Sequence, residues 1–271
     1  MADYRSLHIE RPAEAIAELV LAGPGRGNAM GPDFWRELPA AVAEIEADRE
    51  VRALVVRGAG EHYSYGLDLP AMGAELSALL ADGAAGRAAV VEQARRMERG
   101  FAALAASRLP VVAAVDGWCI GAGIEIIAAC DLRLATPRAR FALREVKVGM
   151  VADLGGIQRL PHLVGEAWAR ELALTGDDID AATALRIGLV TRLVDAPQLV
   201  DEARALAARV AANPPLVVAA IKQVMNARID AAVAAGNLAA ATQNGLLMQS
   251  EDFAEAMRAF SERRPAVFRG R

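Results

Sequence analysis

Cysteine, histidine and aromatic residues are scarce in this sequence, whose 271 residues include 2 cysteines, 3 histidines and 4% aromatic residues. Cys119 and Cys130 allow at most one disulfide, and they lack the spacing of metal ligands. Both stand among apolar residues, so we expect buried thiols, with a disulfide between them as the alternative. The sequence predicts no metal site.

The three histidines offer no obvious catalyst. His8 and His62 lie in segments expected at the surface, and His162 lies in an apolar helical stretch. A catalytic triad that joins one of them to Ser64 or Ser107 is therefore disfavoured. Nucleophilic hydrolysis is disfavoured with it.

The sequence also lacks an excess of positive charge and any long apolar run. It has 30 basic and 34 acidic residues, a net charge of -4 and a pI near 5.6, so we expect no nucleic-acid partner. Residues 109–115 and 124–130 end well before the roughly 20 residues of a membrane span. We therefore expect no membrane partner. The two ends show no secretory, peroxisomal or reticulum-retention signal, so we expect a cytoplasmic protein.

What the sequence does contain is an alternation of strand and helix patterns. Residues 16–22 and 52–57 read as strands, and a helical pattern that starts near Pro32 or Asp33 separates them. Residues 71–106 are alanine-rich, with glycines near 82–86, and predict a mobile loop followed by a helix. This alternation predicts an α/β architecture.

The segment around residue 120 carries the clearest pattern. Residues 109–115 predict a buried strand, a glycine-rich turn at 121–123 starts a helix, and residues 131–135 predict another strand. A further helix is expected over residues 155–164. From residue 194 onward the pattern is helical only, and Pro214-Pro215 separates helices expected over residues 201–212 and 216–235. We therefore expect an α/β core over residues 1–195 and a helical region over residues 196–271.

The glycine turn does not match the common phosphate loops. It lacks the Gly-Lys-Ser/Thr ending of a P-loop, and Ile126 replaces the third glycine of a dinucleotide-binding turn. Such a turn either packs closely or presents free N–H groups at the start of a helix, where negative charge is stabilised. An N–H that stabilises a developing oxyanion is worth about 3 to 4 kcal/mol.

Three acidic residues follow predicted strands or precede helices. Glu125 stands in the first helical turn among isoleucines, where it either caps the helix or is a buried carboxylate with a chemical role. Glu145 has Arg144 and Lys147 as potential ion-pair partners, and Asp153 is placed to cap the next helix. Together the three carboxylates can also converge on one cleft as general acids and bases.

These segments resemble the crotonase (enoyl-CoA hydratase/isomerase) superfamily over nearly the whole chain. The resemblance rests on an ordered series of motifs. They are residues 26–30 (RGNAM), 62–69 (HYSYGLDL), 110–131 (PVVAAVDGWCIGAGIEIIAACD), 145–149 (EVKVG), 156–161 (GIQRLP) and 184–190 (ALRIGLV). The resemblance implies an α/β crotonase (ClpP-like) fold of repeated ββα units, with a C-terminal helical region that forms homotrimers or homohexamers.

The resemblance also implies an acyl-CoA thioester as substrate, with CoA as part of that substrate and no separate cofactor. By motif position, the N–H groups of Tyr65 and Ala122 would form an oxyanion hole. The implied CoA-binding residues are Arg26, Gly66, Leu67, Asp68 and Leu69, together with Phe260 and Arg263, whose positions in the family close over CoA from a neighbouring subunit.

The acidic residues point to two reactions within the superfamily. Glu125 and Glu145 resemble the glutamate pair of 2-enoyl-CoA hydratases of fatty acid beta-oxidation. Asp153 stands where hydratases have a small residue, and residues 151–155 resemble Δ3,5-Δ2,4-dienoyl-CoA isomerases. We expect an isomerase in which Glu145 serves C2 and Asp153 serves C6. A hydratase is the alternative, and a non-catalytic acyl-CoA-binding protein is a second one. The acyl pocket is expected to be shaped by residues 71–106.

Overall fold

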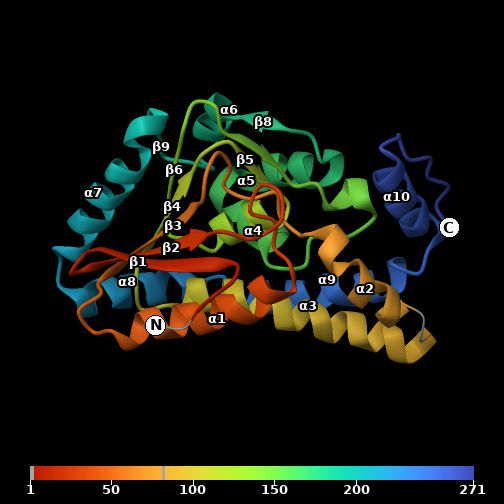
Figure 1. Ribbon diagram of the computed structural model, residues 1–271, viewed down its shortest axis with the longest axis horizontal. Helices are drawn as coiled ribbons and strands as arrows, with labels where there is room; N and C mark the ends of the chain where they lie inside the picture. Colours follow the sequence, from red (N-terminus) through yellow and green to blue (C-terminus); the bar gives the residue numbers. More distant parts are fainter. Residues whose placement is uncertain (1–2, 81–82) are drawn as a thin grey trace.

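A large sheet organises the computed structural model, which describes residues 3–80 and 83–271 (Figure 1). Its strand order is β1-β2-β3-β4-β6-β9; β1 runs antiparallel to β2, and each later neighbouring pair is parallel. The strands are β1 (Leu7–Ala13), β2 (Ile16–Leu21), β3 (Ala53–Gly58), β4 (Val111–Val115), β6 (Leu132–Ala135) and β9 (Arg192–Leu193). The α/β class predicted from the sequence is confirmed.

A small second sheet positions the loops that matter for function. It contains β5 (Trp118–Ile120), β7 (Arg140–Ala142) and β8 (Ile179–Asp180), with β5 parallel to β7. After β4 and after β6 the chain passes from the large sheet into the small one. An isolated parallel bridge between Ser64 and Cys119 places the segment after β3 beside β5 in the same way. Three successive segments therefore leave the small sheet at one edge.

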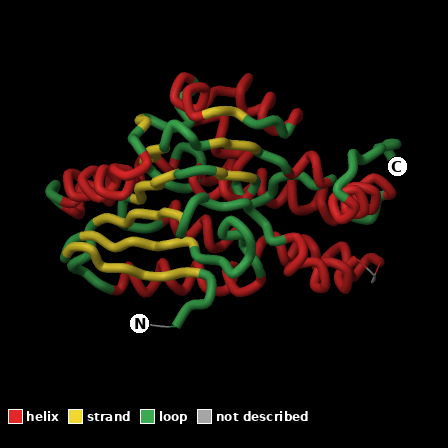
Figure 2. Tube along the Cα trace, turned by 45° about the horizontal axis from the view of Figure 1, so that its top comes forward, coloured by secondary structure: helices red, strands yellow, loops and turns green. Residues whose placement is uncertain are grey.

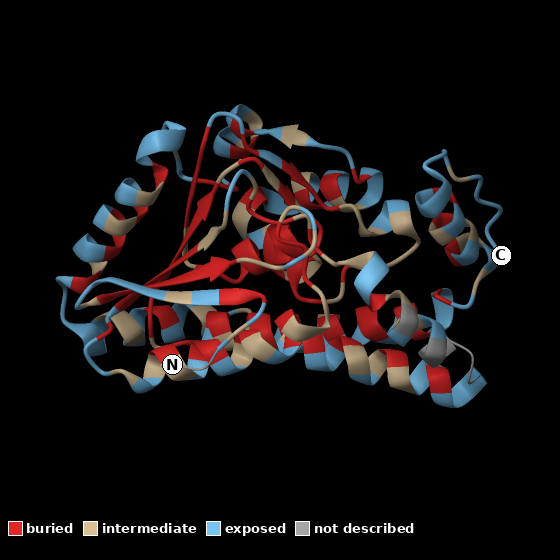
Figure 3. Cartoon of the chain, viewed as in Figure 1, coloured by how far each residue is buried: buried red, intermediate tan, exposed pale blue. Residues whose placement is uncertain are grey.

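The helices cover both faces of the large sheet, because alternate strand residues point to opposite sides. Leu54 and Val56 face α1, α3 and α4, whereas Ala53 and Val55 face α7. Figure 2 shows the strands between these helical layers, and Figure 3 shows α4 as a buried element at the centre. The helices are α1 (Pro32–Ala47), α2 (Leu69–Leu80), α3 (Gly83–Ala106), α4 (Ala122–Ala128), α5 (Gly156–Thr175), α6 (Ala181–Arg186), α7 (Leu199–Ala211), α8 (Pro215–Ala227), α9 (Asp230–Leu247) and α10 (Glu251–Glu262), with 3-10 turns η1 (Glu145–Val148) and η2 (Ala196–Gln198).

Two predicted elements differ from the structure. The loop expected from residue 71 is wrong for residues 71–80, which belong to α2. The Asp68 carboxylate accepts a hydrogen bond from the Ala71 N–H at 3.0 Å near the start of this helix, and Met72 is fully buried. Residues 81–82 lie outside the described part. The helix expected over residues 216–235 is two helices, α8 and α9, which are separated near Ile229.

The two cysteines are buried thiols, as predicted. Cys119 and Cys130 are both free and buried. Within residues 3–80 and 83–271, no single helix is long and apolar enough to cross a bilayer, although residues 196–211 and 215–227 pass that test as a pair bent by 103°.

Helix α8 exposes an apolar surface. Five of its apolar side chains are more than half exposed: Leu216, Val217, Ile221, Val224 and Met225. Its one buried residue is Lys222, whose ammonium group donates to the carbonyls of Leu104 and Leu109 and pairs with Asp131 at 2.8 Å. The helix is thus held by a polar anchor while its apolar side chains face outward. A surface of this kind is typical of a subunit interface.

We propose that another copy of the chain covers this surface of α8. The double variant Leu216→Glu/Val224→Glu should lower the mass measured by light scattering to that of a monomer, while circular dichroism stays helical because Lys222 is intact. Leu174→Glu, at an exposed leucine of α5, is the matched control and should keep the wild-type mass. A monomeric wild type, or a double variant with unchanged mass, would refute this interface.

Candidate active site

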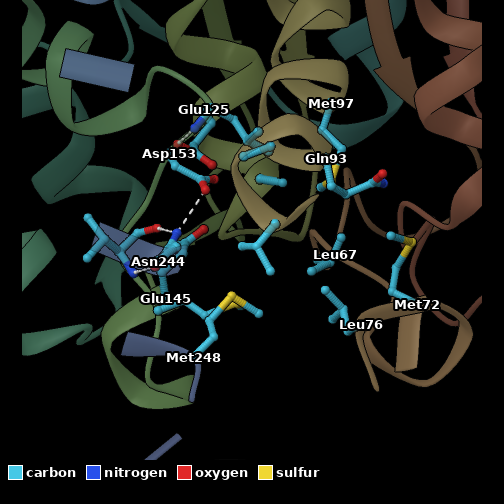
Figure 4. Close-up of a pocket in the computed structure, with 16 residues that line it drawn as sticks. Leu67, Met72, Leu76, Gln93, Met97, Glu125, Glu145, Asp153, Asn244 and Met248 are labelled. Atoms are coloured by element: carbon cyan, nitrogen blue, oxygen red, sulfur yellow. Dashed lines mark hydrogen bonds between the residues drawn. The ribbon is translucent and has the colours of Figure 1, made fainter. Parts of the chain in front are cut away.

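Two adjoining cavities lie at the edge where the loops leave the small sheet. The inner cavity has a volume of about 70 Å³, and the outer one about 630 Å³. Four residues line both: Leu67, Ala122, Glu145 and Met150. Figure 4 shows the three acidic side chains and Asn244 on one side of the inner cavity, and Leu67, Met72 and Leu76 together with Gln93 on the opposite side. All three acidic residues singled out in the sequence line the inner cavity.

Glu125 is buried by the fold itself. Its side chain leaves α4 with a residue exposure of 2%, and its Oε1 accepts hydrogen bonds from the N–H groups of Leu154 at 3.1 Å and Gly156 at 3.0 Å. These donors belong to the segment that leads into α5 and not to the start of α4. Glu125 therefore fixes that segment against α4 and does not cap its own helix.

Glu145 forms neither of the ion pairs that the sequence suggested, with Arg144 or with Lys147. Arg144 pairs with Asp178, and Lys147 pairs with Asp177 at 2.9 Å. Among the described residues, the buried Oε2 of Glu145 has no hydrogen-bond partner. Gly121 permits this placement, because it adopts φ +54° and a Cβ there would lie 3.0 Å from Glu145 Oε1. The carboxylate is thus available to a ligand.

Asp153 does not cap the following helix either. The N-cap of α5 is Gly155, which has no side-chain cap. Asp153 Oδ2 instead accepts a hydrogen bond from Asn244 Nδ2 at 2.8 Å. Figure 4 shows this bond between the loop before α5 and helix α9.

The cavity raises the pKa of all three acids. Burial raises the pKa of Glu125 well above its usual range, and the charges of Glu145 and Asp153 add to the rise. Burial also raises the pKa of Glu145 to about 7, against the lowering effect of its own backbone N–H. Burial raises the pKa of Asp153 to about 6, while the hydrogen bond from Asn244 lowers it. Near neutral pH, Glu145 and Asp153 can therefore exchange roles as proton donor and acceptor.

The expected pair of oxyanion donors needs one correction. The Tyr65 N–H donates to the Gly27 carbonyl at 2.8 Å, so it is already occupied. In the described part of the chain, the N–H groups of Leu67 and Ala122 have no acceptor, and both residues line both cavities. Gly66 brings the two together, because a Cβ on it would lie 3.0 Å from Ala122 N. Leu67, and not Tyr65, is therefore the candidate second donor beside Ala122.

Comparison with known proteins agrees with this geometry. The model of the enoyl-CoA hydratase/isomerase family matches residues 11–271. The chain belongs to the enoyl-CoA hydratase/isomerase family. The mitochondrial Delta(3,5)-Delta(2,4)-dienoyl-CoA isomerase of Dictyostelium discoideum is 36% identical over 99% of this chain and 93% of its own. The (E)-benzylidenesuccinyl-CoA hydratase of Thauera aromatica is 34% identical over 94% of this chain and 96% of its own.

A solved structure shares the fold over almost the whole chain and confirms the crotonase fold predicted from the sequence. The crystal structure of an enoyl-CoA hydratase from Mycobacterium avium subsp. paratuberculosis matches with a TM-score of 0.85 and 26% identity, over 98% of this chain and 100% of that one. Family membership implies an acyl-CoA substrate. The isomerase and the hydratase relatives have similar sequence identity to this chain, so identity alone does not distinguish the two reactions.

The outer cavity collects most of the residues expected to bind CoA in a member of this family. Arg26, Leu67, Asp68, Leu69 and Phe260 line it. Gly66 packs against the Ile120 carbonyl and does not line the outer cavity. Arg263 is exposed, ends α10 with φ +54° and lines neither cavity.

Phe260 lines the outer cavity of its own chain, whereas the resemblance had suggested a neighbouring subunit. Its side chain is 53% exposed. Helix α10 therefore lies beside the cavity that its own chain forms. Figure 1 shows α10 at the end of the molecule that carries the C-terminus.

Sequence reasoning missed some of the lining residues in this enoyl-CoA hydratase/isomerase family member. Arg144 lines the outer cavity and lies over the Trp118 ring, with its Cζ 5.6 Å from the centroid. Asn244 and Met248 come from the helical C-terminal region and line the inner cavity. An asparagine inside an alanine-rich helix was the one available signal for Asn244. Among the described residues, no group of histidine, cysteine and acidic side chains is arranged to hold a metal ion.

The raised pKa of Glu145 predicts how stability depends on pH. Because the folded-state pKa of about 7 lies above the ordinary 4.5, ionised Glu145 destabilises the folded state above pH 7, and this effect disappears below about pH 4.5. Relative to wild type, Glu145→Gln should therefore raise the free energy of unfolding at pH 8 by about 1 to 3 kcal/mol more than at pH 5.

Urea unfolding at the two pH values measures this difference. Glu171→Gln, at an exposed position of α5, is the control and should show no such dependence on pH. Equal effects of Glu145→Gln at both pH values would contradict the burial of an ionisable Glu145.

Proposed function

We propose that this protein isomerises 3,5-dienoyl-CoA to 2,4-dienoyl-CoA. The observation that carries the proposal is the third carboxylate, Asp153, which lines the same inner cavity as Glu145 and has no ion-pair partner among the described residues. Moving two double bonds requires a proton to leave one carbon and another to arrive four carbons away. Two separate acid/base groups meet that requirement.

In the proposed reaction, ionised Glu145 takes a proton from C2 of the bound thioester. The C2–H electron pair becomes delocalised from the thioester oxygen to C6. Protonated Asp153 then gives its proton to C6, so that the double bonds move from C3 and C5 to C2 and C4. Atoms and charges balance, because Glu145 ends protonated and Asp153 ends ionised. Proton exchange with water restores both. Because the pKa of Glu145 is about 7 and that of Asp153 about 6, the reactive form is the less populated of the two singly protonated forms.

The thioester oxygen gains negative charge during this reaction. The N–H groups of Leu67 and Ala122 are free to donate to it, and both lie at the junction of the two cavities. Their effect would be largest in the dienolate, where the charge on oxygen is greatest. The acyl chain would then extend into the inner cavity, among apolar residues such as Met72 and Met97, while CoA occupies the outer one.

Hydration of 2-enoyl-CoA is the second candidate, and one observation favours it. Glu125 and Glu145, which resemble the hydratase pair, both line the inner cavity. The hydratase relative is also almost as similar in sequence as the isomerase relative. Two amide donors already hold Glu125 Oε1, which fits a supporting role for Glu125 better than the activation of water.

Purified protein given 3,5-dienoyl-CoA should form a conjugated dienoyl absorbance faster than it consumes 2-enoyl-CoA. Asp153→Asn should lower the isomerisation kcat by about 100-fold to 10,000-fold, because it removes the group that protonates C6. Glu125→Gln is the matched comparison, because it changes another acid of the same cavity; it should lower isomerisation less.

Isomerisation and hydration predict opposite effects of Asp153→Asn on the main activity. If 2-enoyl-CoA hydration is the main activity and survives Asp153→Asn intact, the isomerase proposal is wrong. Acyl-CoA binding with no turnover of either substrate would instead support the non-catalytic alternative.

A further inference from the structure

Asn244 is the residue of the C-terminal helices that enters the acidic side of the inner cavity. It lies on α9, is 3% exposed and lines the cavity beside Asp153 (Figure 4). It makes three hydrogen bonds to the loop before α5. Oδ1 accepts from the Val151 N–H at 2.8 Å, and Nδ2 donates at 2.8 Å both to the Val151 carbonyl and to Asp153 Oδ2.

A carboxamide is the only short side chain that can make this set of bonds. Its oxygen accepts, and its nitrogen carries two hydrogens. One edge of the amide pairs with both backbone groups of Val151, and this pairing fixes which terminal atom is oxygen and which is nitrogen. The second N–H is then directed to Asp153. Leucine has the same approximate shape and none of these bonds, and an ionised aspartate can only accept.

The absence of charge on Asn244 matters as much as its hydrogen bonds. A lysine or arginine here would hold Asp153 ionised over the whole physiological range and prevent it from carrying a proton. An amide donor orients the carboxylate and leaves it able to gain or lose a proton. The titratable groups that face Asp153 in this cavity are Glu125 on α4 and Glu145 on η1; the lining residues from α2, α3 and α9 are uncharged.

We infer that Asn244 is a positioning residue that holds the Asp153 carboxylate at the reacting end of the acyl chain. This inference rests on the proposed role of Asp153 as the acid at C6. Helix α9 would thus set the orientation of an acid that the α/β core supplies.

The test compares Asn244→Asp and Asn244→Leu with the same changes at Asn237. Asn237 is a matched control, because it lies on the same helix, is 7% exposed and donates its Nδ2 to Glu98 Oε1 at 3.1 Å outside the cavity. Each variant is assayed for kcat, KM and the pH profile of 3,5-dienoyl-CoA isomerisation. Thermal unfolding separates loss of fold from loss of positioning.

Both Asn244 variants should lose on the order of 10-fold to 100-fold in kcat with a smaller change in KM, because the acid is displaced from C6. Their pH profile as a whole should move to higher pH, because the bond from Asn244 lowers the pKa of Asp153. The shift should be larger for Asn244→Asp, which adds a like charge. The Asn237 variants should keep the wild-type pH profile.

The outcomes separate this inference from the proposed function. Wild-type kcat and pH profile in the Asn244 variants, with activity lost in Asp153→Asn, would overturn the role of Asn244 alone. Full isomerase activity in Asp153→Asn would overturn the proposed function itself. If Asn244→Leu fails to fold, Asn244→Asp still tests the role of Asn244. Its carboxylate can accept the hydrogen bond from the Val151 N–H that the Asn244 amide oxygen accepts in the wild type.

Discussion

Three carboxyl groups share one small cavity, and the ionisation of each opposes the ionisation of the others. Glu125, Glu145 and Asp153 all line it, and burial raises the pKa of each. The cavity therefore retains protons near neutral pH, where exposed acids would have lost them. The proposed transfer of hydrogen between carbons needs groups in both protonation states, and the shared desolvation would supply them. Among the described residues that line this cavity, none carries a positive charge.

The fold meets this requirement through parallel strands. The segments that follow β5 and β7 leave the small sheet at the same edge, and the Ser64–Cys119 bridge brings the segment after β3 to that edge too. One segment provides Leu67, the next provides Ala122 and the third provides Glu145. Backbone donors and an acid thus meet without any side chain having to reach far. Asp153 depends on one more contact, which comes from α9.

Much of this was predictable from local pattern, and the rest was not. The buried strand before the glycine turn and the three acids were visible because apolar spacing and turn residues are local signals. Tyr65 was predicted as an oxyanion donor, but its N–H donates to the Gly27 carbonyl. Gly27 lies 38 residues earlier in the chain, so a local pattern could not reveal this bond. Helix α2 was missed because alanine and glycine composition did not reveal the burial of Met72. Asn244 was missed because its partners are about 90 residues away.

The central claim is that two free backbone amides hold the thioester oxygen next to acids that carry exchangeable protons. A crystal structure with an unreactive acyl-CoA bound tests it most directly. We predict that the thioester oxygen lies about 2.7 to 3.1 Å from both Leu67 N and Ala122 N, with C2 facing Glu145 and C6 facing Asp153. A thioester oxygen bound away from these two amides would contradict the account. So would an acyl chain placed so that Glu145 and Asp153 both face the same carbon.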